Sequence, residues 1–196
     1  MLDHRPGQRS VAFLLGKPPR AGTLLPEVIA LLNAVEVDTA VHLPHDQPEL
    51  PDWVAGVDLV VHRGLKWSAL RSVAQLAEAG VPCCNPPDAV ALTRKRPALM
   101  ALLGQAGLPV PLTVMVRHWQ DARSAATTLS VIKTVEGADG RGENVLAGTL
   151  ALQIFGVDFL MGEAGPVIVD VNPFPGFRGV GEGPAMIAEH LLARLD

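Results

Sequence analysis

Short apolar runs alternate with helical stripes over the first 85 residues. Residues 11–15 (VAFLL) form an apolar run that ends at a glycine and two prolines, which is typical of a buried strand. Residues 66–79 carry apolar side chains at helical spacing and stop before a glycine and a proline. The same criteria predict a helix at 24–35 and strands at 37–43, 58–61 and 81–84. This order of elements indicates a small open α/β sheet.

A second unit begins near residue 86. We therefore expect an N-terminal α/β domain at 1–85 and an α+β domain at 86–196. Pro97 suits the first turn of a helix that ends at Gly107 and Pro109. The other expected elements are strands at 112–116, 130–134, 155–161 and 167–172, helices at 121–129 and 184–195, and a glycine-rich loop at 136–142.

The expected C-terminal hairpin gives the most specific chemical signal. Strict alternation with valines puts Asp170 and Asn172 on one face of the second strand. A three-residue loop pairs Gly162 with Pro166 and so sets Asp158 opposite Asp170. Neighbouring carboxylates repel unless a cation or proton lies between them, and oxygen ligands without His or Cys suit Mg²⁺. The hairpin is therefore a candidate magnesium site, and acids that merely face solvent are the alternative.

A lysine and a glycine-rich loop form a candidate phosphate site. Lys133 ends a buried strand, where a lysine is costly unless it meets an anion. Gly137, Gly140 and Gly142 would let backbone N–H groups approach phosphate oxygens. A plain hairpin turn has a similar composition, and the spacing fits neither the Walker loop nor the dinucleotide fingerprint.

Two groups of basic residues lie next to predicted elements. Arg94, Lys95 and Arg96 precede the helix at Pro97, where cations oppose the helix dipole and an anionic ligand would relieve them. Taken alone, this run is better explained by long side chains that reach into water. The pair His62-Arg63 could bind an acidic substrate, but a surface pair at a strand end is the favoured interpretation.

Composition excludes several classes of protein. The net charge of −4 gives the chain no reason to hold a polyanion, and 4% aromatic residues make a base-stacking platform improbable, so no nucleic-acid partner is expected. No apolar run approaches the ~18 residues of a membrane helix, and the N-terminus lacks the apolar core of a signal peptide. Two adjacent cysteines, Cys83 and Cys84, fit a buried strand and a reducing, cytoplasmic location.

Several of these segments resemble the ATP-grasp superfamily. Residues 156–160 (GVDFL) and 165–177 (GPVIVDVNPFPGF) resemble its C-terminal signature. Residues 81–87, Arg96 and 107–111 resemble the junction between its N-terminal and nucleotide-binding domains. The likeness is greatest to ligases that join glutamate or other amino acids to an acceptor, and to ATP-grasp inositol-polyphosphate kinases, whose signature also reads Asp-x-Asn-x-x-Pro-Gly.

The resemblance implies an ATP-grasp-like fold with ATP and Mg²⁺ as cofactors. It assigns the magnesium ligands to Asp158, Asp170 and Asn172. Lys133 would contact the nucleotide phosphates beneath the glycine-rich loop. The second phosphate contact would be Arg96, where the family more often has lysine, and Lys95 one position away is the alternative.

One segment departs from the family pattern. In the family, several dozen residues separate the glycine-rich loop strand from the Gly-x-Asp strand, whereas about a dozen lie between Asn144 and Phe155 here. Either the chain is a reduced relative, or a mobile segment is missing from it. We expect the central part to be shortened or missing, and we predict a break between Asn144 and Ala151.

The sequence thus predicts an ATP-dependent ligase that activates a small-molecule or peptide carboxylate as an acyl phosphate for attack by an amine. A small-molecule kinase on the same fold and a reduced, non-catalytic nucleotide-binding relative are the alternatives. The catalytic residues, the substrate and a homodimeric state are left open.

Overall fold

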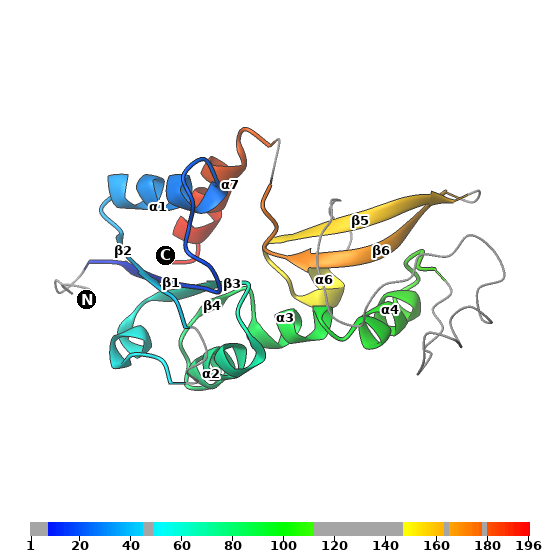
Figure 1. Cartoon of the computed structure of the whole chain (residues 1–196), viewed down its shortest axis with the longest axis horizontal. Helices are drawn as coiled ribbons and strands as arrows, with labels where there is room; N and C mark the ends of the chain where they lie inside the picture. Colours follow the sequence, from blue (N-terminus) through cyan, green and yellow to red (C-terminus); the bar gives the residue numbers. More distant parts are fainter. Residues whose placement is uncertain (1–7, 45–48, 112–146, 163–164, 178–179) are drawn as a thin grey trace.

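The computed structural model describes residues 8–44, 49–111, 147–162, 165–177 and 180–196 (Figure 1). A parallel sheet with its helices lies beside an antiparallel hairpin, which confirms the predicted α/β plus α+β class. No helix among the described residues is long and apolar enough to cross a membrane. The elements are β1 (Ser10–Leu15), α1 (Leu24–Ala34), β2 (Asp38–His42), η1 (Asp52–Gly56), β3 (Leu59–Arg63), α2 (Trp67–Glu78), β4 (Cys83–Cys84), α3 (Pro87–Thr93), α4 (Arg96–Gln105), α6 (Ala147–Leu150), β5 (Phe155–Gly162), β6 (Gly165–Pro173) and α7 (Gly183–Leu192).

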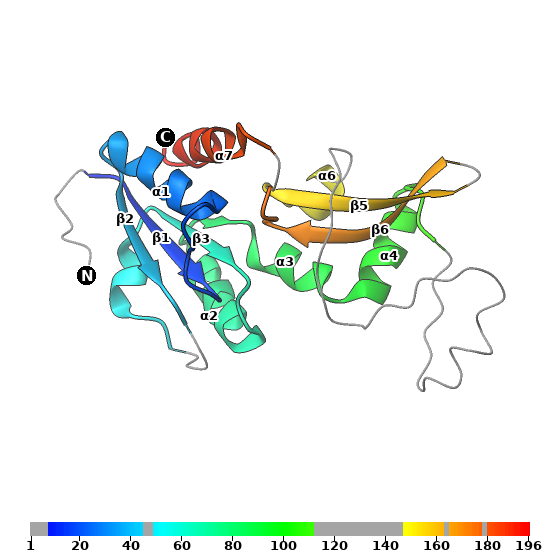
Figure 2. The same cartoon turned by 45° about the horizontal axis from the view of Figure 1, so that its top comes forward.

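The first four strands form a parallel sheet in the order β2-β1-β3-β4. Successive side chains of β1 point to opposite faces, as the period of a strand requires. Val11 and Phe13 pack in one core cluster with α1 and α7, whereas Ala12 and Leu14 pack in another with α2. Figures 1 and 2 show these helices on the two faces of the sheet. Burial on both faces explains why β1 reads as an unbroken apolar run.

The C-terminal helix α7 packs on the N-terminal unit. Its Ile187 and Leu191 share a core cluster with Val28 and Leu32 of α1. Figure 2 shows α7 beside α1, with the hairpin lying on its other side. The domain division at residue 85 stays a prediction, and the structure adds that the chain returns to the first unit after crossing the second.

Short helices connect the sheet to the hairpin. Helix α3 was not expected, because its seven residues begin at a proline and are too few to show a periodic stripe. Beneath the hairpin, Leu99 and Leu103 of α4 share a core cluster with Val157 and Val171. The strands and helix expected at 112–134 lie outside the described residues.

The chain runs without interruption from α6 into β5. Helix α6 occupies Ala147–Leu150, and Leu150 and Leu152 are buried in the same cluster as the hairpin. The predicted break between Asn144 and Ala151 stays a prediction, because residues 144–146 lie outside the described part. Buried leucines explain why this short connection, rich in small residues, is folded rather than open.

A single buried asparagine joins the two units. Asn85, which follows β4, accepts hydrogen bonds from the backbone N–H groups of Gln153 and Ile154, both at 2.7 Å. Its amide nitrogen donates to the carbonyl oxygen of Ile154 at 2.6 Å. Because Ile154 leads directly into β5, Asn85 fixes the hairpin relative to the edge of the parallel sheet.

The two cysteines have the structural role expected from sequence. Both are buried and carry no disulfide. Burial raises the pKa of the Cys83 thiol to about 11 and that of the Cys84 thiol to about 12. Both thiols therefore stay protonated near neutral pH, where only a thiolate would be a nucleophile.

Candidate functional site

The hairpin register brings the predicted acidic residues together. Asp158 on β5 lies directly opposite Asp170 on β6, and Gly156 lies opposite Asn172. Opposed residues of an antiparallel pair project from the same face, so both carboxylates share one face of the ribbon. Asp170 is 4% exposed and Asp158 is half-buried. That these side chains bind a magnesium ion stays a prediction.

The predicted turn was wrong by one residue, and a β-bulge restores the register. Gly162 pairs with Gly165, not with Pro166 as expected. The register then shifts between Asp158 and Phe159, where Val169 is the extra residue on β6. The shorter turn and the bulge offset each other, which is why Asp158 still faces Asp170.

Asp170 forms an ion pair with Arg96, the first residue of α4. The guanidinium Nη2 lies 2.8 Å from Oδ2 of Asp170, and the two side chains are 14% and 6% exposed. The other carboxylate oxygen, Oδ1, accepts a hydrogen bond from the backbone N–H of Val171. The predicted phosphate contact and the predicted metal ligand are thus in direct contact, although 74 positions separate them in sequence.

The structure separates the three basic residues before α4. The guanidinium of Arg94 lies over the ring of Trp67, 5.3 Å from its centroid, in the geometry of a cation–π contact. Lys95 is exposed, and Arg96 pairs with Asp170. The expectation that all three reach into water is therefore wrong for Arg94 and Arg96, and Arg96 is the better placed of the two candidate phosphate contacts.

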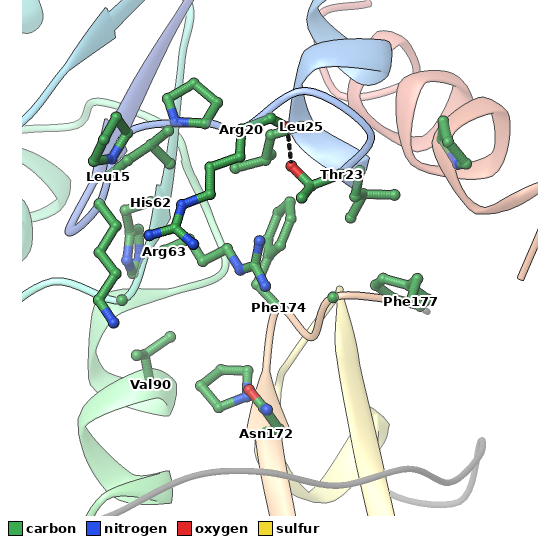
Figure 3. Close-up of a pocket in the computed structure, with 18 of the residues that line it drawn as sticks. Leu15, Arg20, Thr23, Leu25, His62, Arg63, Val90, Asn172, Phe174 and Phe177 are labelled. Atoms are coloured by element: carbon green, nitrogen blue, oxygen red, sulfur yellow. Dashed lines mark hydrogen bonds between the residues drawn. The ribbon is translucent and has the colours of Figure 1, made fainter. Parts of the chain in front are cut away.

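A cavity of about 1330 Å³ lies between the parallel sheet and the hairpin. It opens at the carboxyl ends of β1 and β3, where the chain turns to opposite sides of the sheet, which is where open α/β sheets bind ligands. Asp170 and Asn172 line its far side. Figure 3 shows Arg20 and Arg63 extending into the cavity, with Asn172 and Phe174 on the side of β6.

Phe174 closes the end of β6 against the sheet. Its backbone lies in the left-handed region at φ 61°, which is rare for a bulky residue. Its side chain is 2% exposed, and its N–H donates to the carbonyl oxygen of Ile154 at 2.9 Å. The guanidinium of Arg63 lies 5.9 Å from the centroid of the Phe174 ring. Burial and this hydrogen bond hold the backbone in its unusual conformation at the edge of the cavity.

The pair His62-Arg63 is not the surface pair that the sequence favoured. His62 is 3% exposed, and its Nε2 lies 2.7 Å from the backbone oxygen of Asn85. A carbonyl oxygen can only accept, so Nε2 carries the proton. Burial lowers the pKa of His62 to about 4, and the nearby charge of Arg94 acts in the same direction. His62 is therefore neutral at pH 7 and supports the wall of the cavity without charging it.

We expect acid to destabilise the protein partly through His62. Its pKa is lower in the folded state than in the unfolded one, so the unfolded state binds the additional proton, and stability is lost as pH falls from about 6.5 towards about 4. Urea unfolding at pH 7, 6, 5 and 4.5 measures this loss, and His62→Gln is expected to flatten the profile. His190, whose pKa burial also lowers, is present in both proteins and cancels in the comparison. Parallel pH profiles for the two proteins would contradict the assignment.

The donor set of the hairpin fits Mg²⁺. In the described part of the chain no three His, Cys, Asp or Glu side chains form a cluster, so a metal site on the hairpin would use two carboxylates and an amide oxygen. Such hard oxygen donors suit a magnesium ion that keeps some of its waters and binds phosphates. In the structure the carboxylate of Asp170 contacts the guanidinium of Arg96 at 2.8 Å.

The rest of the predicted phosphate site lies outside the described residues. These are Lys133, Gly137, Gly140 and Gly142. Conversely, the cavity contains cations that sequence reasoning missed, namely Lys17, Arg20 and Lys66. The available signal was their position within about five residues of the ends of the buried strands at 11–15 and 58–61, because the carboxyl ends of parallel strands meet at one edge.

Solved ATP-grasp structures share the fold of this chain. A RimK domain protein of the ATP-grasp type from Sphaerobacter thermophilus superposes with a TM-score of 0.66 at 18% sequence identity, covering 93% of this chain and 99% of that one. The ATP-grasp ligase PsnB, solved with a minimal precursor, Mg and ADP, gives a TM-score of 0.64 at 16% identity, with 95% and 97% covered.

A third solved structure with this fold is that of a synthetase. N5-carboxyaminoimidazole ribonucleotide synthetase from Thermotoga maritima gives a TM-score of 0.65 at 13% identity, covering 88% of this chain and 70% of that one. No protein-family model matches the sequence, and no curated protein matches it significantly. The chain has the ATP-grasp fold, as its C-terminal signature led us to expect.

Proposed function

We propose that this chain, which has the ATP-grasp fold, is an ATP-dependent carboxylate–amine ligase. The observation that carries the proposal is the pairing of Asp158 with Asp170 on a hairpin whose Asp170 also contacts Arg96. The two acids could bind the magnesium ion of a magnesium nucleotide, and the cation could bind its phosphates. They come from opposite ends of the second unit. The fold is shared with PsnB, a ligase solved with Mg and ADP, which supports the same use here.

The proposed reaction has two steps. A substrate carboxylate oxygen attacks the γ-phosphorus of ATP, which forms an acyl phosphate and releases ADP. An amine then attacks the acyl carbon, the C–O bond to phosphate breaks, and the amine loses a proton to give an amide and inorganic phosphate. Asp158, Asp170 and Asn172 would hold Mg²⁺, which supplies charge neutralisation for the phosphates when bound. Lys133 and the loop with Gly137, Gly140 and Gly142 would bind phosphate oxygens.

Arg96 would exchange partners when the nucleotide binds. In the structure its guanidinium and the Asp170 carboxylate balance each other in a site that is nearly closed to water. A buried charge without a partner is costly, so one partner can leave only if another arrives. A metal at Asp170 and a phosphate at Arg96 would arrive together as one complex, so neither charge would be left uncompensated.

A second candidate function is supported by the short connection before β5. About a dozen residues lie between Asn144 and Phe155, where the resemblance led us to expect several dozen. A protein that binds a nucleotide without catalysing ligation would fit such a reduced chain. No observation in the described residues favours a kinase over these two candidates.

Nucleotide binding and turnover separate the two candidates. Isothermal titration calorimetry with ATP, with and without Mg²⁺, tests the site, and ADP release is measured with amino acids and dicarboxylates as trial substrates. Hydroxylamine present in the assay traps an acyl phosphate as a hydroxamate. Mg²⁺-dependent binding with hydroxamate formation supports the ligase, and binding without ADP release supports the non-catalytic candidate. Absence of ATP binding would contradict both.

Substitution of the two candidate phosphate contacts gives a sharper result. We expect Arg96→Gln to weaken binding of magnesium ATP roughly tenfold to a hundredfold, because a hydrogen bond between charged groups is worth about 1–3 kcal/mol. Lys95→Gln removes an equal charge from an exposed neighbour and is expected to change the dissociation constant less than threefold. The reverse order of effects would contradict the assignment of Arg96. Circular dichroism establishes that both variants are folded at the temperature of the titration.

A further inference from the structure

We propose that the sheet side of the cavity binds a second anionic group of the substrate, so that the enzyme acts on molecules with at least one negative charge besides the reacting carboxylate. The inference rests on the proposed function and specifies its substrate. The shared chemistry of the second group is that of a carboxylate or a phosphate. Two loops bring four cations to the mouth of the cavity, namely Lys17, Arg20, Arg63 and Lys66.

A tight backbone contact joins the two loops that carry these cations. Gly16, after β1, donates its N–H to the carbonyl oxygen of Arg63 at 2.9 Å. A Cβ atom at Gly16 would overlap the carbonyl oxygen of Gly64, so only glycine permits this approach. Gly64 itself has a φ of 64°, a conformation that also favours glycine. The loops are therefore held together by the backbone, and their cations line the same cavity.

Positive charge is in excess on this side of the cavity. Among the described residues that line it, the carboxylates are Glu27 and Asp170, and Asp170 is already paired with Arg96. The nearby cations outnumber the remaining acid, and Lys17, Arg20 and Lys66 are all exposed. A concave site that gathers one sign of charge attracts ions of the opposite sign.

The N-termini of two helices add to the positive potential in this part of the cavity. The N-terminal ends of α1 and α2 both line the cavity, through Thr23 and Leu24 in one helix and Lys66 and Trp67 in the other. Helix N-termini carry partial positive charge, and cations placed there are unfavourable unless an anion is also bound. Helix α2 has no acidic residue in its first turn that could act as this anion. A bound anionic group would offset both the partial positive charge of the helix N-termini and the charge of the nearby cations.

The geometry directs the rest of such a substrate towards the reacting centre. The guanidinium of Arg63 lies over the ring of Phe174, two residues after Asn172 on the proposed magnesium strand. Figure 3 shows the side chains of Arg20 and Arg63 entering the same open space, with Asn172 across it. An anion held at the arginines would leave the other end of the molecule facing Asn172 and Asp170.

Three small probes test the proposal on the full chain. Butyrate carries one carboxylate, glutarate carries two, and 3-phosphoglycerate carries a carboxylate and a phosphate. Their dissociation constants are measured by calorimetry at constant ionic strength, with magnesium and a non-hydrolysable ATP analogue present. We expect at least one doubly anionic probe to bind tenfold or more tightly than butyrate, and the preferred probe identifies the second group as carboxylate or phosphate. Equal binding of all three probes, or no binding below 10 mM, would overturn the proposal.

Variants locate the preference in the two arginines. Arg20→Gln and Arg63→Gln are each expected to weaken binding of the preferred probe at least fivefold and to leave butyrate within twofold. The matched control is Arg71→Gln, which removes an exposed arginine of α2 that does not line the cavity. If Arg71→Gln lowers affinity as much as the other two, the effect is one of overall charge and the proposal fails.

Failure of this inference can be told apart from failure of the proposed function. Titration of the ATP analogue alone, in the same proteins, reports on Asp170 and Arg96 and is expected to be unchanged in Arg20→Gln. Normal nucleotide binding without a preference for doubly anionic probes refutes the inference and leaves the ligase proposal standing. If the preference for doubly anionic probes is retained but the nucleotide does not bind, the ligase proposal is refuted and the anion site stands.

Discussion

Replacing Asp170 by Asn is expected to abolish Mg²⁺-dependent nucleotide binding and to lower the free energy of unfolding by about 3 kcal/mol. The first effect follows from the loss of a charged oxygen donor in the proposed magnesium site. The second follows because the guanidinium of Arg96, whose side chain is 14% exposed, would lose the opposite charge that it contacts at 2.8 Å in a site nearly closed to water. Calorimetry with ATP and urea unfolding measure the two effects separately.

The double variant Asp170→Asn/Arg96→Gln tells the metal role from the charge-pair role. Removing both charges leaves two neutral side chains that can still share a hydrogen bond, so most of the lost stability is expected to return. Nucleotide binding is expected to stay absent, because neither the metal ligand nor the phosphate contact is restored. Recovery of Mg²⁺-dependent binding in the double variant would show that Asp170 acts only by balancing Arg96.

Replacing Asn85 by Ala is expected to cost about 3–5 kcal/mol of stability, a large share of the total for a domain. The side chain is fully buried and hydrogen-bonds both backbone groups of Ile154 and the N–H of Gln153. Alanine would leave these three groups without their partner in a site closed to water. Because they connect the sheet to β5, the second unit is expected to loosen first, which amide hydrogen exchange would detect along β5.

A second asparagine provides the matched control. Asn33 is exposed on α1, and its side-chain oxygen accepts a hydrogen bond from the hydroxyl of Thr39 at 2.7 Å. Asn33→Ala is expected to change stability by less than about 0.5 kcal/mol, as usual for surface substitutions. Comparable losses for Asn33→Ala and Asn85→Ala would contradict the role assigned to Asn85.

Local sequence patterns were enough to predict the first strands and the acidic face of the hairpin. Apolar runs located the first four strands, since burial on both faces leaves few polar positions in β1 and β3. Alternation along 167–172 identified the face that carries Asp170 and Asn172. Such patterns depend on neighbours within a few residues, and these are visible in a single chain. The hairpin turn was wrong by one residue because a bulge leaves no mark on apolar alternation of this length.

The way in which these elements combine depends on contacts between distant parts of the chain. No local pattern joins Arg96 to Asp170 or Asn85 to Ile154, because each pair is separated by about 70 positions and meets only when the two units pack. For the same reason His62, which the sequence favoured at the surface, is buried beneath Asn85. The cavity itself exists because parallel strands end at one edge and the loops with Gly16 and Gly64 meet there. Local periodicity specifies which faces are apolar, and the packing of those faces on one another brings distant polar side chains together.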